Sequence, residues 1–250
     1  MCTVVILRRP GHDWPLVLAA NRDEMRDRPW DGPARHWPDR AHVTAGRDIL
    51  AGGTWMGVND DGLVACVLNR MNTLGPDPDK RSRGELPLEA LDHAEARIAT
   101  EALSHINPDA YRPFNLVVAD AISAWWVRND GERVTSFEIE SGVSMVTAHD
   151  LNDTVTSART RKHLPRFRAA PPPTPDTDDL NDAWFGWKPL MADGSGAPDE
   201  TMCVDLDIGF GTVSSSLVAL SAPRHPPKAP VWWFAAGSPD ETDYQQVLLA

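Results

Sequence analysis

Long hydrophobic runs, paired cysteines and an excess of positive charge are all missing from this sequence of 250 residues. No apolar run approaches the about 20 residues that a membrane-spanning helix needs, so we expect no membrane insertion. The chain does not begin with a basic stretch followed by an apolar one, which argues against a signal peptide and favours a cytoplasmic protein. The 24 Lys and Arg are outnumbered by 36 Asp and Glu, and the resulting net charge of −12 argues against nucleic-acid binding.

Cysteine is scarce, since only Cys2, Cys66 and Cys203 occur. Their odd number and the lack of a Cys-x-x-Cys spacing predict neither a disulfide framework nor a zinc site, and no Cys-x-x-Cys-His or Cys-Pro haem motif is present. We therefore predict no metal site and no cofactor. The hydrophobic content of 42% and charged content of 24% are those of an ordinary globular protein, and we find no clear boundary within a single domain over 1–250.

Two short apolar runs lie in the first 24 residues, Thr3–Leu7 and Leu16–Ala20, with a Pro-Gly turn between them. This pattern predicts a β-hairpin. Both runs are apolar throughout instead of alternating, so both faces of the hairpin should be covered. If the turn centres on the Pro-Gly segment, Cys2 lies opposite Asn21 and Arg22.

The hairpin end carries the residues of a nucleophilic site. Removal of Met1 would leave Cys2 with a free α-amine beside its thiol, and their reference pKa values are about 7.7–8.0 and about 8.5. One residue would then supply both the nucleophile and the base. Arg22 would stabilise the thiolate, and Asp23 or Glu24 would orient the amine. The competing interpretation is a cysteine without a role, followed by a charged, solvated loop.

The Cys2-Thr3 start, followed by the tetrapeptide Asn-Arg-Asp-Glu at 21–24, resembles the NRDE family, which includes the transport and Golgi organisation 2 proteins. The likeness continues in Ala-Gly-Gly-Thr-Trp-Met-Gly-Val-Asn at 51–59 and Ser-Arg-Gly at 82–84. The resemblance implies an α+β fold, a four-layer αββα sandwich of antiparallel sheets like that of N-terminal-nucleophile hydrolases. It also implies a poorly defined activity, with eukaryotic members linked to lipid, coenzyme A and haem handling.

Residues 49–69 predict a second hairpin that turns at Asn-Asp-Asp-Gly. The segment 57–63 is similar to one in cholylglycine hydrolases and penicillin V acylases that leads to an oxyanion-stabilising Asn. This similarity implies that Asn69 is such a donor, worth roughly 3 kcal/mol; the alternative is an Asn that caps a turn. Around this hairpin we expect a long loop over 25–47 and one helix from Pro87 to about residue 105.

The segment 148–170 contains candidates for a second oxyanion donor. The amidase resemblance implies an Asn here, for which Asn152 is the candidate, although His149 is an alternative for the same position. His149 would otherwise act as a base or be an ordinary polar side chain. The basic run between Arg159 and Arg168 predicts a solvated helix face.

Together these patterns predict hydrolysis or acyl transfer at a non-peptide amide or thioester. Arg22 and Asp23 are adjacent, so on a strand they would point to opposite faces, and Glu24 would share a face with Arg22. The predicted catalytic residues are Cys2, Arg22, Asp23, Asn69 and Asn152, and the predicted substrate-binding residues are Asn21, Glu24, Trp55 and His149. The rival hypothesis is a carrier of haem, lipid or acyl-coenzyme A on the same fold. No feature of the sequence fixes an oligomeric state.

Overall fold

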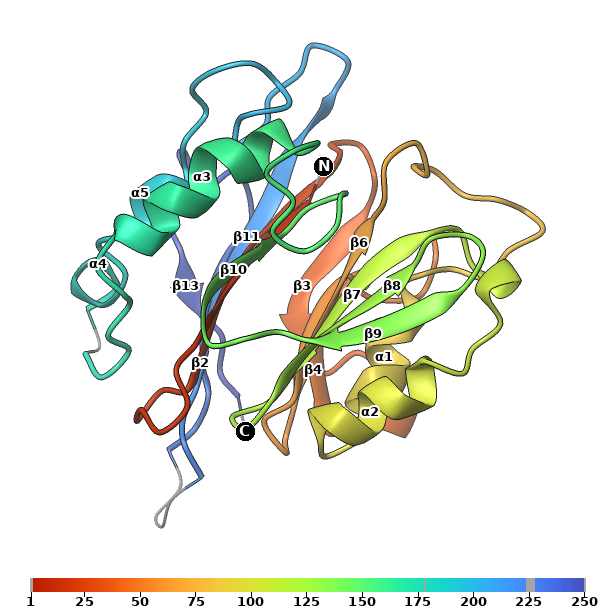
Figure 1. Cartoon of the computed structure of the whole chain (residues 1–250), viewed down its shortest axis with the longest axis horizontal. Helices are drawn as coiled ribbons and strands as arrows, with labels where there is room; N and C mark the ends of the chain where they lie inside the picture. Colours follow the sequence, from red (N-terminus) through yellow and green to blue (C-terminus); the bar gives the residue numbers. More distant parts are fainter. Residues whose placement is uncertain (1, 178, 224–227, 250) are drawn as a thin grey trace. The chain divides into compact units, whose positions relative to one another are not determined.

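A computed structural model describes residues 2–177, 179–223 and 228–249, and it divides the chain into two compact units (Figure 1). The first unit comprises Met1–Asp27 with Ser141–Leu248, and the second comprises Arg28–Glu140 with Leu249–Ala250. Each unit is built on one sheet of antiparallel strands with helices packed against it. Cys2 therefore belongs to the first unit, whose two segments are far apart in the sequence.

The sheet of the first unit has the strand order β10-β1-β2-β11-β12-β13. The bounds of its strands are β1 Thr3–Arg8, β2 Leu16–Met25, β10 Gly142–Val146, β11 Phe210–Leu220, β12 Val231–Ala235 and β13 Gln245–Gln246. The predicted hairpin is confirmed, because β1 and β2 pair with Thr3 opposite Asn21 and Arg8 opposite Leu16. Cys2 lies one residue beyond the first of these pairs, level with Arg22. The predicted register is therefore right to within one residue.

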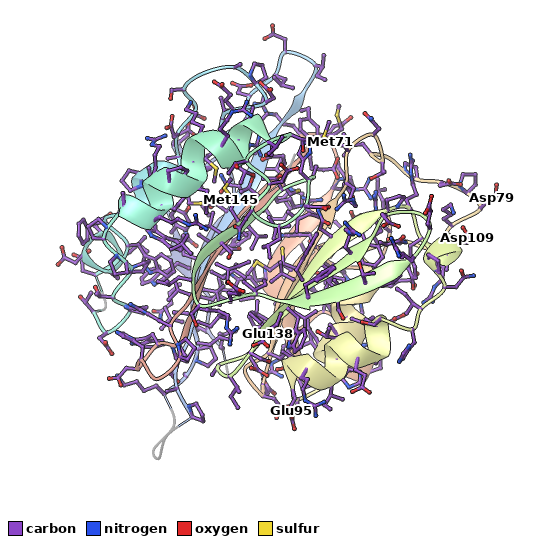
Figure 2. The ribbon with its side chains drawn as sticks, viewed as in Figure 1. Met71, Asp79, Glu95, Asp109, Glu138 and Met145 are labelled. Atoms are coloured by element: carbon purple, nitrogen blue, oxygen red, sulfur yellow. The ribbon has the colours of Figure 1, made fainter. Side chains whose placement is uncertain are left out.

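Three helices accompany this sheet: α3 Ala158–Ala169, α4 Leu180–Ala183 and α5 Lys188–Met191 (Figure 1). Odd-numbered residues of β1 and β2, such as Val5 and Val17, share a core with Phe167 of α3 and with Trp184 and Trp187. Met145 of β10 joins the same core from the edge of the sheet (Figure 2). Because side chains alternate along a strand, this core identifies the helix-covered face of the sheet.

The second unit is a sheet whose strands follow one another in chain order, from β3 to β9. The bounds are β3 Trp30–Ala34, β4 Val43–Asp48, β5 Met56–Asn59, β6 Val64–Asn69, β7 Phe114–Ala119, β8 Ala124–Asn129 and β9 Val134–Glu138. Two helices, α1 Glu85–Leu91 and α2 Ala96–Leu103, pack on one face over a core that includes Leu63, Leu86 and Leu116. The 3-10 turns Pro38–Arg40 and Pro108–Ala110 lie in connections, and Asp79 and Asp109 project outward from loops of this unit (Figure 2).

Two expectations from the sequence were wrong in this unit. The stretch 25–47, predicted as a long loop, contributes the end of β2, all of β3 and most of β4. The single helix predicted from Pro87 is instead the pair α1 and α2. It breaks before Ala96, where the carboxylate of Asp120 accepts the backbone N–H of Ala96 and so satisfies a donor at the start of α2.

Within the described part of the chain, no helix combines the length and the apolar character that crossing a bilayer requires.

Candidate active site

Side chains at the paired ends of β1 and β2 alternate between the two faces of the sheet. Val17 and Ala19 belong to the helix-covered core, so Asn21 and Asp23, which follow at intervals of two, are directed to that face. Thr3, which pairs with Asn21, is directed there as well. Cys2 and Arg22 occupy the alternate positions and share the other face. The predicted separation of Arg22 from Asp23 is thus present in the structure.

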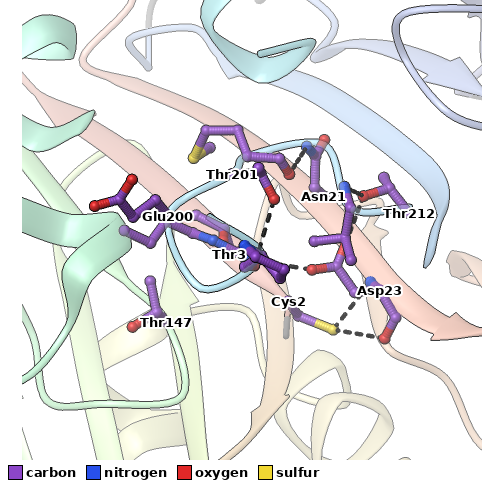
Figure 3. Close-up of polar contacts among 12 residues, drawn as sticks. Cys2, Thr3, Asn21, Asp23, Thr147, Glu200, Thr201 and Thr212 are labelled. Carbon is purple, nitrogen blue, oxygen red and sulfur yellow. Dashed lines mark hydrogen bonds and ion pairs between the residues drawn. The ribbon is translucent and has the colours of Figure 1, made fainter. Parts of the chain in front are cut away.

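The sulfur of Cys2 is held by the backbone of the neighbouring strand. It accepts the N–H of Asp23 at 3.4 Å and donates to the carbonyl oxygen of Asp23 at 3.5 Å, as the dashed lines in Figure 3 show. The Cys2 side chain is partly buried. An N–H donor to sulfur favours the thiolate, whereas the carbonyl acceptor favours the thiol. Both protonation states therefore have a partner at the same place.

The pKa of the Cys2 thiol is raised above its ordinary value, chiefly because burial penalises the thiolate and further because the Asp23 carboxylate repels it. The backbone N–H of Asp23 and the Arg22 guanidinium act in the opposite direction. At neutral pH the residue is consequently a thiol. It needs a base to become a nucleophile.

The carboxylate of Asp23 is completely buried and is bound on both oxygens. Oδ1 accepts the hydroxyl of Thr212 at 2.7 Å, and Oδ2 accepts Nη1 of Arg159 at 3.2 Å. The same Nη1 donates to the hydroxyl of Thr3 at 2.8 Å. Arg159 was predicted to lie on a solvated face of α3, and this is wrong, because its side chain is only 3% exposed. It is turned inward by its ion pair with Asp23.

A β-bulge in β11 gives Asp23 and Arg22 different neighbours. Thr212 pairs with Asp23 and Ser214 pairs with Arg22, so Val213 is an extra residue on β11. In a regular strand, Thr212 and Ser214 would point to the same face. The bulge instead directs Thr212 to the helix-covered face, where it reaches Asp23, and places Ser214 level with Arg22.

Asn21, predicted to contact substrate, has its side chain engaged within the protein. Nδ2 donates to the carbonyl oxygens of Met191 and Met202, both at 2.9 Å, and Oδ1 accepts the hydroxyl of Ser215 at 2.7 Å. Figure 3 shows Asn21 and Asp23 on the same side of β2. Asn21 therefore ties β2 to the segment around α5. The role in substrate binding stays a prediction.

The other predicted residues of the first unit lie in two places. Glu24 is partly exposed on β2, where Oε1 accepts the N–H of Met25. His149 and Asn152 lie in the loop between β10 and α3. Asn152 adopts a positive φ of 57° and binds back to β10, with Oδ1 accepting the N–H of Met145 and Nδ2 donating to Ser144. Asn152 thus shapes this loop, and its role as an oxyanion donor stays a prediction.

Asn69 and Trp55 belong to the second unit. Asn69 ends β6 opposite Phe114, in the row that faces α1 and α2. Its role as an oxyanion donor also stays a prediction. Trp55 packs edge-on against Trp30 at 5.6 Å and lies over Gly46, where an added Cβ would come within 2.3 Å of the indole.

The sequence did not predict the partners of the Asp23 side chain, Arg159 and Thr212. No local pattern brings them together, because they lie 136 and 189 positions from Asp23 in the chain. Ser157 is the sequence feature that could have indicated the direction of the Arg159 side chain. It caps α3 by accepting the N–H of Thr160, which fixes the first turn and hence the direction of Arg159.

Among the residues that the structure describes, no three His, Cys, Asp or Glu side chains gather in a way that would hold a metal ion.

Solved structures with a similar fold include an acid amidase, a penicillin acylase and a bile acid hydrolase. An N-acylethanolamine-hydrolysing acid amidase orthologue of Caenorhabditis elegans matches with a TM-score of 0.56 and 13% identity, over 89% of this chain and 94% of that one. A penicillin V acylase of Agrobacterium tumefaciens matches with a TM-score of 0.52 and 16% identity, over 94% and 83%. The mutant C2A conjugated bile acid hydrolase of Clostridium perfringens matches with a TM-score of 0.53 and 12% identity, over 99% and 97%. The predicted fold class is confirmed, and the chain is an α+β protein with the N-terminal-nucleophile hydrolase fold.

The chain belongs to the Transport and Golgi organisation 2 family, whose model matches residues 1–170. It is 33% identical over 115 residues to the transport and Golgi organization 2 homolog of Mus musculus and 32% identical over 112 residues to that of Homo sapiens. These matches cover 42% and 44% of this chain, and they span only 38% and 40% of the length of the two relatives. The family resemblance read from the sequence motifs is thereby confirmed.

Proposed function

We propose that the chain is a cysteine N-terminal-nucleophile hydrolase or acyltransferase that acts on a non-peptide amide or thioester. The observation that carries the proposal is the position of Cys2, a partly buried residue just before β1 whose sulfur is held by the backbone of Asp23. Arg22 lies on the same face and lowers the pKa of the Cys2 thiol. A nucleophile and a cation that share one face of a sheet can act on one bound carbonyl group.

The reaction follows from the protonation state of the thiol. After removal of Met1, the free α-amine of Cys2 takes the thiol proton as the sulfur bonds to the substrate carbonyl carbon. The carbonyl π electrons move to oxygen and form an oxyanion. Collapse of this intermediate breaks the bond to the amine or thiol leaving group, which takes the proton from the ammonium. Water then attacks the resulting thioester and releases the acid, or another amine or thiol takes the acyl group.

Three side chains are proposed to stabilise charge during these steps. Arg22 favours the thiolate as it forms, since a guanidinium nearby lowers a thiol pKa. Asn69 and Asn152 are the proposed oxyanion donors, and each would contribute roughly 3 kcal/mol if its amide meets the oxyanion. Asp23 acts through its backbone, which holds the sulfur, while its carboxylate stays on the helix-covered face.

The names of the structural neighbours support the chemical class. They are an amidase that hydrolyses N-acylethanolamine, a penicillin V acylase and a conjugated bile acid hydrolase. The bile acid hydrolase was changed from cysteine to alanine at its own second position, as the designation C2A records. A cysteine at position 2 is thus present on this fold in another protein.

The test uses the full chain with a panel of an N-acylethanolamine, penicillin V, a conjugated bile acid and a long-chain acyl-coenzyme A. Intact mass first shows whether Met1 has been removed, and then whether an acyl group sensitive to hydroxylamine is attached. We expect one acyl adduct in the wild type, none in Cys2→Ala and an unchanged adduct in the matched control Cys66→Ala, since Cys66 is buried in the second unit.

The proposal fails if Met1 is retained or if turnover persists in Cys2→Ala. The rival function as a carrier gives a different result. Haem or acyl-coenzyme A would then bind equally to the wild type and to Cys2→Ala, without an adduct and without turnover.

A further inference from the structure

We propose that Arg159 is a positioning residue for the Cys2 nucleophile: from the opposite face of the sheet, its guanidinium holds the ends of β1 and β2 together through Thr3 and Asp23. The inference deepens the proposed function and rests on it, because it takes the Cys2 thiol as the group to be positioned. Its geometric basis lies entirely within the first unit of the chain.

The guanidinium of Arg159 binds both strands at the positions beside the sulfur. Nη1 lies 2.8 Å from Oγ1 of Thr3 and 3.2 Å from Oδ2 of Asp23. Thr3 is the residue that follows Cys2, and Asp23 is the residue whose N–H and carbonyl hold the sulfur. One side chain therefore fixes the two backbone positions that decide where the sulfur lies.

The burial of this ion pair points to a positional role. The side chain of Arg159 is 3% exposed and that of Asp23 is 0% exposed. Such a buried pair contributes little net stability compared with well-packed apolar residues of the same volume. The pair instead fixes the positions of the groups it joins, because a guanidinium binds its partners with fixed geometry and hydrogen bonds to charged groups are strong in a low dielectric.

The first turn of α3 delivers Arg159 in a fixed orientation. Ser157 caps the helix, its Oγ accepting both the N–H and the hydroxyl of Thr160. The hydroxyl of Thr147, the residue that follows β10, lies 3.3 Å from the same Oγ. The loop that carries His149 and Asn152 is therefore anchored at the turn from which Arg159 reaches the hairpin.

The charge of Arg159 should affect the pKa of the Cys2 thiol, which a purely structural role would leave unchanged. The Asp23 carboxylate raises the pKa of the Cys2 thiol, after the larger effect of burial, and the Arg22 guanidinium lowers it. Arg159 partly neutralises that carboxylate from the far side. Removing Arg159 should therefore raise the thiol pKa, whereas removing the charge of Asp23 should lower it.

The experiment measures alkylation of Cys2 by iodoacetamide across pH 6–11, with peptide mass spectrometry assigning the adduct. In Arg159→Gln we expect the midpoint to rise by about 0.5 pH unit, and in Asp23→Asn to fall by about the same amount. The plateau rate at high pH should rise at least about threefold in Arg159→Gln, because the end of β1 is released and opens locally. Thr3→Val, which deletes only the hydroxyl contact, should raise the plateau rate in the same way.

Arg161→Gln is the matched control. Arg161 is exposed on the same helix, and its guanidinium donates to the carbonyl oxygens of Thr154 and Val155. It should leave both the midpoint and the plateau at wild-type values. Where a substrate from the panel is turned over, kcat in Arg159→Gln should fall about 100-fold with KM changed little, while Arg159→Lys retains part of the rate.

Wild-type alkylation behaviour in a folded Arg159→Gln variant would overturn the inference. If that variant does not fold, an unchanged plateau rate in Thr3→Val has the same meaning. Failure of the proposed function gives a different result, because the wild type would then turn over no substrate while the alkylation profiles still report on Arg159.

Discussion

The sulfur of Cys2 lies between the two backbone polar groups of Asp23, 3.4 Å from its nitrogen and 3.5 Å from its oxygen. The side chain of Asp23 is directed to the other face of the sheet and binds Arg159 and Thr212. Asp23 therefore acts in two ways: its backbone contacts the Cys2 sulfur, and its carboxylate fixes the position of that backbone. Substitutions on the two faces should accordingly affect reactivity and stability to different extents.

Cys2→Ser should reduce kcat for acyl transfer at least about 1,000-fold, because an alcohol is far less acidic than a thiol. The contacts with the backbone of Asp23, at 3.4 and 3.5 Å, also have the lengths of hydrogen bonds to sulfur. Steady-state kinetics and thermal unfolding together check this, since the melting temperature should change little. Cys203→Ser is the control. Burial raises the pKa of the Cys203 thiol to about 11, so this thiol is inert at neutral pH and the variant should keep wild-type kcat.

His163→Gln should make the stability of the protein less sensitive to mild acid. His163 is fully buried as the neutral ring, with Nε2 donating to the carbonyl of Glu200 and Nδ1 accepting from Arg166. Burial lowers its pKa from 6.5 to about 4. The unfolded chain therefore binds a proton near pH 6.5 that the folded chain binds only near pH 4, and stability falls as the pH decreases through that window.

Urea unfolding at pH 7 and pH 5 measures the effect. His163 should account for a loss of about 2 kcal/mol in the wild type between these two pH values. The loss in His163→Gln should be smaller by that amount. Equal losses in the two proteins would show that His163 does not titrate differently on unfolding.

Gly53→Ala should lower the free energy of unfolding by about 2 kcal/mol or more. An added Cβ on Gly53 would lie 2.5 Å from the backbone of Gly84, and the N–H of Thr54 donates to the carbonyl of Gly84 at 2.8 Å. Two of the family motifs, at 51–59 and 82–84, are therefore in backbone contact. Gly194→Ala, where the nearest atom is a carbonyl oxygen at 3.6 Å, should cost much less in the same denaturation experiment.

Asn21→Ala should lower the free energy of unfolding by about 3 kcal/mol, since it removes the donor to the carbonyl oxygens of Met191 and Met202 and one acceptor of the Ser215 hydroxyl. Chemical denaturation gives the magnitude. Asn107→Ala provides the comparison, because Asn107 is an exposed cap of a short 3-10 turn and should cost about 1 kcal/mol or less. A similar small loss in both variants would indicate that Asn21 serves another purpose than anchoring β2.

Local patterns predicted the elements that depend on neighbours in the sequence. The hairpin of β1 and β2, the Asn-Asp-Asp-Gly turn between β5 and β6, and the opposite directions of Arg22 and Asp23 all follow from period-two alternation and turn chemistry. The fold class followed from motifs in the first 90 residues.

What the sequence did not predict depends on distant residues. β3 and β4 were missed because their Arg, Asp and Pro content is typical of a loop, and the pairing of β3 with β4 and of β4 with β5 outweighs that tendency. Arg159 was assigned to a solvated face because it lies in a run of basic residues. Only the tertiary structure brings the buried carboxylate of Asp23 within its reach.

The bulge and the ion pair also set an order of assembly. Arg159 and Thr212, which enclose the helix-covered side of the β1–β2 end, are translated long after Thr3 and Asp23. At about 5–20 residues per second, roughly 10–40 s pass between synthesis of residues 3 and 212. β10 and α3 are made before β11, so Arg159 can bind Asp23 before Thr212 is available. A chain truncated before β11 should therefore keep the residues of this ion pair but lack both Thr212 and the strand that pairs with β2.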